Sequence, residues 1–295
     1  MKNLINLLVI ISLTALFACD NPQTKTAPAK IKIQDNSVNI AYTDTGKGDT
    51  TLLFVHGWLI NGSYWSNQVD FFSKKYRVVT IDLPGFGQSG KNRNSWTVKD
   101  FGRDVDSVIT QLNLKNVILI GHSMGGDIII EAAIHAPDHI ICLVGIDNLL
   151  NVGQVQSPEL KKEIADFTTA LKKSFKANTT AYFSQYLFYK TTDSITRKRV
   201  LNDVARADST IAIPCIESIM DAEPDAATKL KATKKKLYLI NSDIHQTYTG
   251  GFKANGIPFE LKEIHATGHF PMVEKPAEFN ALLAATIADI KKDSK

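Results

Sequence analysis

A serine with the surroundings of a nucleophile lies in the segment GHSMGG, residues 121–126. This segment follows an apolar run, residues 117–120, and precedes a stretch of helical character that extends to His135. A strand–turn–helix of this kind strains the serine backbone and exposes its hydroxyl, while the flanking glycines allow strand and helix to approach closely. We therefore expect Ser123 to be a nucleophile, with the backbone N–H of Met124 directed at negative charge on a substrate oxygen.

A histidine suited to act as the base for this serine occurs near the C-terminus. His269 lies in the segment GHFPMVEKP, residues 268–276, after the last strand-like run. An imidazole titrates near neutral pH and can accept the serine proton. His265 lies four residues earlier, but Gly268 between them argues against one shared helical face, and there is no HExxH motif. We therefore predict no metal site.

Two aspartates compete for the role of the acid that orients this histidine. Asp147 follows the apolar run at residues 140–146, and Asp243 follows the run at residues 237–240. Both satisfy the chain order serine, acid, histidine, and both lie at the ends of predicted strands. The residue pattern alone leaves the choice open.

The elements that must position these residues are short apolar runs separated by stretches of helical length. Strands buried on both faces show continuous apolar sequence, so we predict an α/β fold with a mostly parallel sheet covered by helices. An antiparallel hairpin is expected before them, at residues 31–33 and 38–42. The predicted buried strands are residues 52–55, 78–81, 117–120, 140–146, 237–240 and 259–264.

A long insertion interrupts this alternation between the fourth and fifth apolar runs. We predict a helical cap at residues 149–229, inserted into a core formed by residues 31–148 and 230–295. Phe167, Leu171 and Phe175 recur within it at helical spacing. A group of aromatic residues in the cap could line a substrate pocket or simply pack the cap: Tyr182, Phe183, Tyr186, Phe188 and Tyr189.

The N-terminus has the layout of an export signal. Lys2 is followed by a mostly apolar stretch that ends at Ala18. This stretch is shorter than a typical transmembrane helix. Residues 16–19, LFAC, resemble the lipobox of bacterial lipoproteins, and this resemblance implies that Cys19 carries the lipid. We expect a signal peptide at residues 1–18, a flexible tether at residues 19–30 and attachment to a membrane of the bacterial cell envelope. The alternatives are a secreted or periplasmic soluble protein, or a retained apolar anchor.

Composition narrows the possible functions further. A chain of 295 residues with 44% hydrophobic residues can bury one large core, and a formal net charge of +4 is too small to indicate nucleic-acid binding. Apart from Cys19, the cysteines are Cys142 and Cys215, which we expect to be buried thiols rather than a disulfide.

Several motifs together resemble the α/β-hydrolase superfamily. Residues 54–58, FVHGW, resemble its oxyanion loop, in which Trp58 supplies a second N–H and His56 has a supporting role. Residues 82–89, DLPGFGQS, and the segment around His269 match two further loops of the family. The resemblance extends from about residue 40 to residue 285 and favours Asp243 as the acid, because the family usually carries its acid after the corresponding strand.

The resemblance implies a serine hydrolase that cleaves an ester or related acyl bond in a small molecule, without a cofactor. Ser123, rather than an aspartate, disfavours the family's epoxide-hydrolase and dehalogenase chemistry. Other members, similar to cofactor-free haloperoxidases, perform perhydrolysis, and others cleave carbon–carbon or amide bonds. These activities remain alternatives. A non-catalytic ligand-binding protein with this fold is an alternative of another class.

Overall fold

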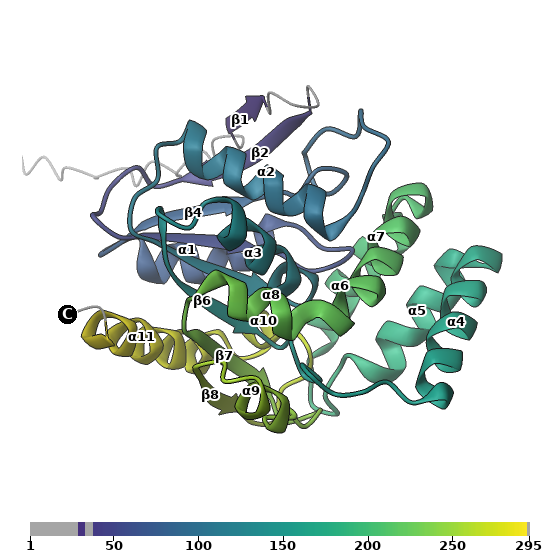
Figure 1. Ribbon diagram of the computed structural model, residues 1–295. Helices are drawn as coiled ribbons and strands as arrows, with labels where there is room; N and C mark the ends of the chain where they lie inside the picture. The colour runs from purple at the N-terminus through teal and green to yellow at the C-terminus, as the bar shows by residue number, and fades with distance from the viewer. Residues whose placement is uncertain (1–28, 33–37, 294–295) are drawn as a thin grey trace, which may run out of the picture.

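An eight-stranded sheet forms the centre of the protein in a computed structural model that describes residues 29–32 and 38–293 (Figure 1). The strand order is β1-β2-β4-β3-β5-β6-β7-β8. Neighbouring strands from β4 onwards in this order are parallel, whereas β1 and β2 form an antiparallel hairpin and β2 pairs antiparallel with β4. The strands are β1 (Ala29–Lys32), β2 (Asn39–Asp44), β3 (Thr51–Val55), β4 (Arg77–Ile81), β5 (Val117–His122), β6 (Ile140–Ile146), β7 (Leu237–Ser242) and β8 (Phe259–Ile264). The predicted mostly parallel α/β sheet is thus confirmed.

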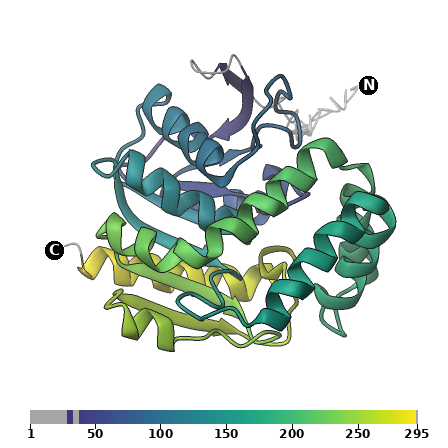
Figure 2. The ribbon, with the colours of Figure 1, turned by 45° about the vertical axis from the view of Figure 1, so that its right-hand side comes forward.

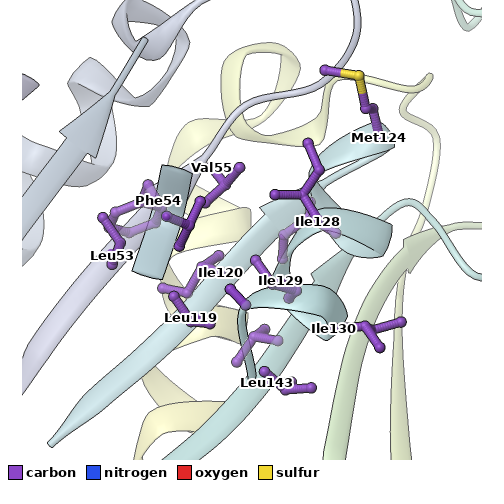
Figure 3. Close-up of a cluster of buried hydrophobic side chains, with 14 of the residues drawn as sticks. Leu53, Phe54, Val55, Leu119, Ile120, Met124, Ile128, Ile129, Ile130 and Leu143 are labelled. Carbon is purple, nitrogen blue, oxygen red and sulfur yellow. The ribbon is translucent and has the colours of Figure 1, made fainter. Parts of the chain in front are cut away.

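The central strands are apolar because helices cover both of their faces. Every residue of β3 and β5 is buried. In Figure 3, Ile128 and Ile129 of the helix after β5 lie against this part of the sheet, beside Leu119 and Ile120. Burial of one such aliphatic side chain contributes about 1.5–3 kcal/mol, so this layer stabilises the position of β5, the strand that leads into Ser123.

Helices form a layer on each face of the sheet (Figure 2). On one face α1 packs against α11, and on the other α3 packs against both α2 and α8. The bounds are α1 (Ser66–Phe72), α2 (Val98–Gln111), α3 (Met124–His135), α8 (Ala226–Thr233) and α11 (Pro276–Asp293). Short elements η1 (Gly62–Trp65), α9 (Gly250–Ala254) and α10 (Pro271–Glu274) complete the connections.

The insertion between β6 and β7 is helical and lies to one side of the sheet in Figure 1. It contains α4 (Pro158–Lys173), α5 (Phe175–Tyr186), α6 (Ser194–Arg206), α7 (Ser209–Ala222) and η2 (Glu223–Asp225). The stripe of Phe167, Leu171 and Phe175 crosses a helix boundary, because α4 ends before Ser174 and α5 begins after it. Since α8 buries Ala226 and Leu230 while packing against α3, the helical layer of the core resumes slightly before the expected boundary at residue 230.

The export segment, Cys19 and almost all of the expected tether lie outside the described residues. Among the helices that the structure does describe, none combines the length and hydropathy required to cross a membrane.

Candidate active site

Ser123 occupies the sharp turn between β5 and α3. Its backbone has φ 51° and ψ −121°, a strained conformation for a residue with a side chain. The turn depends on two glycines: a methyl group at Gly121 would lie 2.2 Å from the carbonyl oxygen of Gly125, and one at Gly125 would lie 2.6 Å from that of Val55. Substitution at either position would therefore force strand and helix apart, which is the reason for the glycine spacing around the serine.

His269 lies in the loop between β8 and α10, and Asp147 binds its side chain. The distance between His269 Nδ1 and Asp147 Oδ2 is 2.5 Å, and the Asp147 side chain is only 1% exposed. The second carboxylate oxygen of Asp147 accepts a hydrogen bond of 2.8 Å from the backbone N–H of Ser242. The backbone N–H of His269 donates to the carbonyl of Leu187 in the cap at 2.9 Å. The core thus holds the imidazole of His269, and the cap holds its backbone.

Asp243 does not contact His269, so the expected pairing of these two residues is wrong. Its carboxylate instead binds His265 Nδ1 at 3.0 Å and the backbone N–H of Ala266 at 3.2 Å. The hydrogen bond from His265 lowers the pKa of Asp243, whose side chain is 39% exposed. Asp147 directly follows β6, and its carboxylate reaches His269, whereas Asp243 follows β7 and its carboxylate is bound by the loop after β8. The alternative acid, Asp147 at the end of β6, therefore occupies the place beside the histidine.

The loop after β3 faces the serine, as its sequence predicts. A methyl group at Gly57 would lie 3.0 Å from Ser123 Cβ, so only glycine allows this approach. His56 accepts a hydrogen bond from the Leu83 N–H at Nε2 (2.9 Å), and its Nδ1–H therefore donates to the Gly57 carbonyl (2.8 Å). Burial lowers the pKa of His56, against the opposing charge of Asp82. A neutral, buried His56 thus shapes the loop and takes no direct part at the serine.

Trp58 links the same loop to the cap. Its indole N–H donates a hydrogen bond of 2.9 Å to the carbonyl of Ala212 in α7, and its ring packs against Phe175 and Phe183 of α5. Met124, directly after the serine, is the first residue of α3. The first N–H groups of a helix have no partner within that helix, so the Met124 N–H is available to a bound anion.

Ser123, His269 and Asp147 line one cavity of about 790 Å³ between the core and the cap. Trp58 and Met124 also line it. The cap contributes mainly apolar and aromatic side chains, including Leu160, Phe167, Tyr182, Phe183, Tyr186 and Ile219. Three of the five aromatic residues highlighted in the sequence therefore line the cavity, whereas Phe188 and Tyr189 do not.

The charged side chains that line this cavity, apart from histidines, are all acidic. Besides Asp147 they are Asp127, Glu163 and Glu223, and no lysine or arginine of residues 38–293 lines it. Burial, reinforced by the nearby charge of Glu223, raises the pKa of Asp127 to about 7. Asp127 was not among the predicted site residues, although its position one helical turn after Ser123 places it on the same side of α3.

The described residues offer neither a cluster of metal ligands nor a reactive thiol. Within residues 29–32 and 38–293, no group of three or more His, Cys, Asp or Glu residues could hold a metal ion. Cys142 and Cys215 are both buried and free, in agreement with the expected thiols. Burial raises the pKa of each thiol to about 12, which keeps both protonated and unreactive at neutral pH.

With this geometry, the chain belongs to the α/β-hydrolase fold family, whose family model matches residues 50–208. A 2-hydroxy-6-oxononadienedioate/2-hydroxy-6-oxononatrienedioate hydrolase of Escherichia coli is 24% identical over 90% of this chain and 98% of its own length. A protein of Synechocystis, provisionally named a non-heme chloroperoxidase, is 30% identical over 61% of this chain, and the match covers 66% of its own length.

Solved structures share the fold closely. A bromoperoxidase from Bacillus anthracis has a TM-score of 0.77 at 23% identity, with 89% of this chain and 100% of that chain covered. A thermophilic esterase from Thermogutta terrifontis has a TM-score of 0.74 at 21% identity, with 89% and 98% covered. At these identities the likeness establishes the fold alone, and the substrate must be argued from the cavity of this chain.

Proposed function

We propose that the protein is a serine hydrolase that cleaves an ester or related acyl bond through an acyl-enzyme on Ser123. The observation that carries this proposal is the buried hydrogen bond between Asp147 and His269, in the cavity that the strained Ser123 also lines. A nucleophile, a base and an acid that orients the base are the minimal set for acyl transfer to water. No cofactor is required for this chemistry.

In the proposed cycle, Ser123 Oγ adds to the carbonyl carbon while its proton passes to His269. The resulting oxyanion is stabilised by the backbone N–H groups of Trp58 and Met124. Collapse of this intermediate breaks the bond to the leaving alcohol, which takes the proton from His269. Water then attacks the acyl-enzyme with His269 again acting as base. The second tetrahedral intermediate releases the carboxylic acid as His269 returns the proton to Ser123 Oγ. Asp147 holds the imidazole in the required tautomer throughout.

The cavity favours neutral or cationic acyl substrates over dicarboxylates. The E. coli relative is named for substrates that are dioates, which carry two carboxylates at neutral pH. Glu163 and Glu223, together with the ionised fraction of Asp127, would repel such a group, and the described chain places no lysine or arginine in the cavity to bind it. The apolar cap side chains suit a hydrocarbon acyl group instead. An ester with an apolar acyl chain is therefore the proposed substrate class, ahead of carbon–carbon cleavage of a diacid.

Active-site labelling tests this function directly. A fluorophosphonate should label the wild-type protein covalently, and a panel of p-nitrophenyl esters should show turnover that depends on acyl length. Ser123→Ala should fold normally, lose labelling and lose at least ~10³-fold in turnover, because the acyl-enzyme cannot form. A folded wild-type protein that neither reacts with the label nor hydrolyses any ester of the panel would instead indicate the non-catalytic binding protein.

A further inference from the structure

His122, the residue before the nucleophile, makes a hydrogen bond to the backbone of the catalytic base. His122 Nε2 lies 2.6 Å from the backbone carbonyl oxygen of His269, and the two imidazole ring centres are 4.7 Å apart. A carbonyl oxygen only accepts hydrogen bonds, so His122 Nε2 must carry the proton. A single hydrogen bond therefore joins the last residue of β5, adjacent to Ser123, to the loop that carries His269.

The other ring nitrogen of His122 shows that this ring is neutral. His122 is 1% exposed, and its buried Nδ1 has no hydrogen-bond partner in the described structure. That nitrogen faces the oxyanion loop, since a methyl group at Gly57 would lie 2.7 Å from it. A proton on Nδ1 would place an unpaired charge in a buried site, which is strongly unfavourable. Burial, together with the neighbouring His269, lowers the pKa of His122 well below its usual value.

We propose that His122 is a positioning residue that sets the placement of His269 relative to Ser123 through its Nε2–H. This inference rests on the proposed function. His269 is already held by its side chain at Asp147 and by its backbone N–H at Leu187. The hydrogen bond from His122 fixes the backbone carbonyl of His269. It links the base directly to β5, the strand that leads into Ser123. A neutral ring here also adds no positive charge beside His269 when that imidazole is protonated during turnover.

Two amide substitutions separate this positioning role from packing. In His122→Gln the amide nitrogen is as many bonds from Cβ as Nε2 is, so it can still donate to the His269 carbonyl. In His122→Asn the amide is one bond shorter and cannot reach, and His122→Phe keeps a ring but has no donor. We expect the Asn and Phe variants to lose ~10–100-fold in kcat with little change in KM, because misplaced reacting groups slow the chemical step. The Gln variant should stay within ~3-fold of wild type.

The fluorophosphonate reaction gives an independent readout of the same placement. Its maximal inactivation rate should fall with kcat in the Asn and Phe variants and recover in the Gln variant. His265→Gln is the matched control, since this exposed histidine on the same loop pairs with Asp243 outside the cavity, and it should leave both rates unchanged. Wild-type rates in the Asn and Phe variants, or a Gln variant as impaired as the Asn variant, would overturn the proposal.

Nitrogen NMR of the histidines in the unmodified protein provides a test that needs no variant to fold. His122 should remain in the neutral Nε2–H form from about pH 5 to pH 8, the range in which an ordinary histidine titrates. Titration of His122 within that range would overturn the inference. Failure of the proposed function would be distinct, because the wild-type protein itself would then show neither ester turnover nor labelling.

Discussion

Asp147 Oδ2 and His269 Nδ1 lie 2.5 Å apart, although 122 positions separate the two residues in the chain. The bond is formed where β6 ends beside β5, so that the acid, the base and the serine meet at one edge of the sheet. The carboxyl ends of parallel strands are the usual place for ligands in such sheets. The contact therefore identifies the proposed acid and the carboxyl end of the strands as the place where we propose that a substrate binds.

Asp147→Asn should reduce turnover of a p-nitrophenyl ester by up to ~10⁴-fold, because the amide no longer holds His269 in the tautomer that accepts the serine proton. Asp243→Asn is the matched control. That residue pairs with the exposed His265, so turnover should stay within ~3-fold of wild type. Steady-state kinetics on folded samples distinguishes the two, and the reverse order of effects would restore Asp243 as the acid.

Asp127→Asn should stabilise the protein at high pH. Burial raises the pKa of Asp127 to about 7, above the value of about 3.9 for an unfolded chain. Between these values the folded state binds more protons than the unfolded state, so this group reduces stability as the pH rises from about 4 to about 7. The variant lacks this penalty, and we expect its melting temperature to exceed that of wild type by ~2–5 °C at pH 8.

The stability difference between Asp127→Asn and wild type should shrink towards pH 4, where the native carboxyl is protonated. Thermal unfolding across this pH range measures it. Asp70→Asn on the surface of α1 serves as the control for removal of a negative charge and should not reproduce the trend. A gain that is equal at both ends of the range would contradict the raised pKa as its cause.

The acidic lining should make the enzyme reject anionic acyl groups. We expect kcat/KM for a p-nitrophenyl monoester of a dicarboxylic acid to be at least ~10-fold below that for the neutral acyl ester of equal length, through charge repulsion in the cavity. Glu223→Gln combined with Asp127→Asn should narrow this ratio without a matching change on the neutral ester. Equal rates on both esters in the wild-type protein would argue against the proposed substrate class.

The export hypothesis rests on residues outside the described structure and is tested separately. We propose that Cys19 carries a lipid, since LFAC at residues 16–19 resembles a lipobox and follows an apolar segment. Cys19→Ala should abolish incorporation of a palmitate analogue in bacteria and release the protein from the membrane fraction, or leave its signal peptide uncleaved. Cys142→Ala is the control, because this thiol is buried in the core. Unchanged incorporation in Cys19→Ala would exclude Cys19 as the anchor.

The sequence determined the elements that depend on local pattern. The apolar runs predicted the strands of a mostly parallel sheet, since strands covered on both faces must be apolar along their whole length. The turn around Ser123 was predictable because Gly121 and Gly125 are required within a few residues of it. The loop at Gly57 was predictable for the same reason, and so was the helical insertion, from its length and spacing.

Only the tertiary structure decided which acid reaches His269. Asp147 and Asp243 both follow apolar runs, and their sequence contexts do not reveal that the Asp147 carboxylate reaches His269 while the Asp243 carboxylate binds His265. The acidic lining of the cavity and the bond from His122 to the His269 backbone were equally hidden, because they join residues from distant segments. Local sequence specifies backbone conformation and burial, whereas the partner of a polar side chain depends on which distant segments the fold brings together.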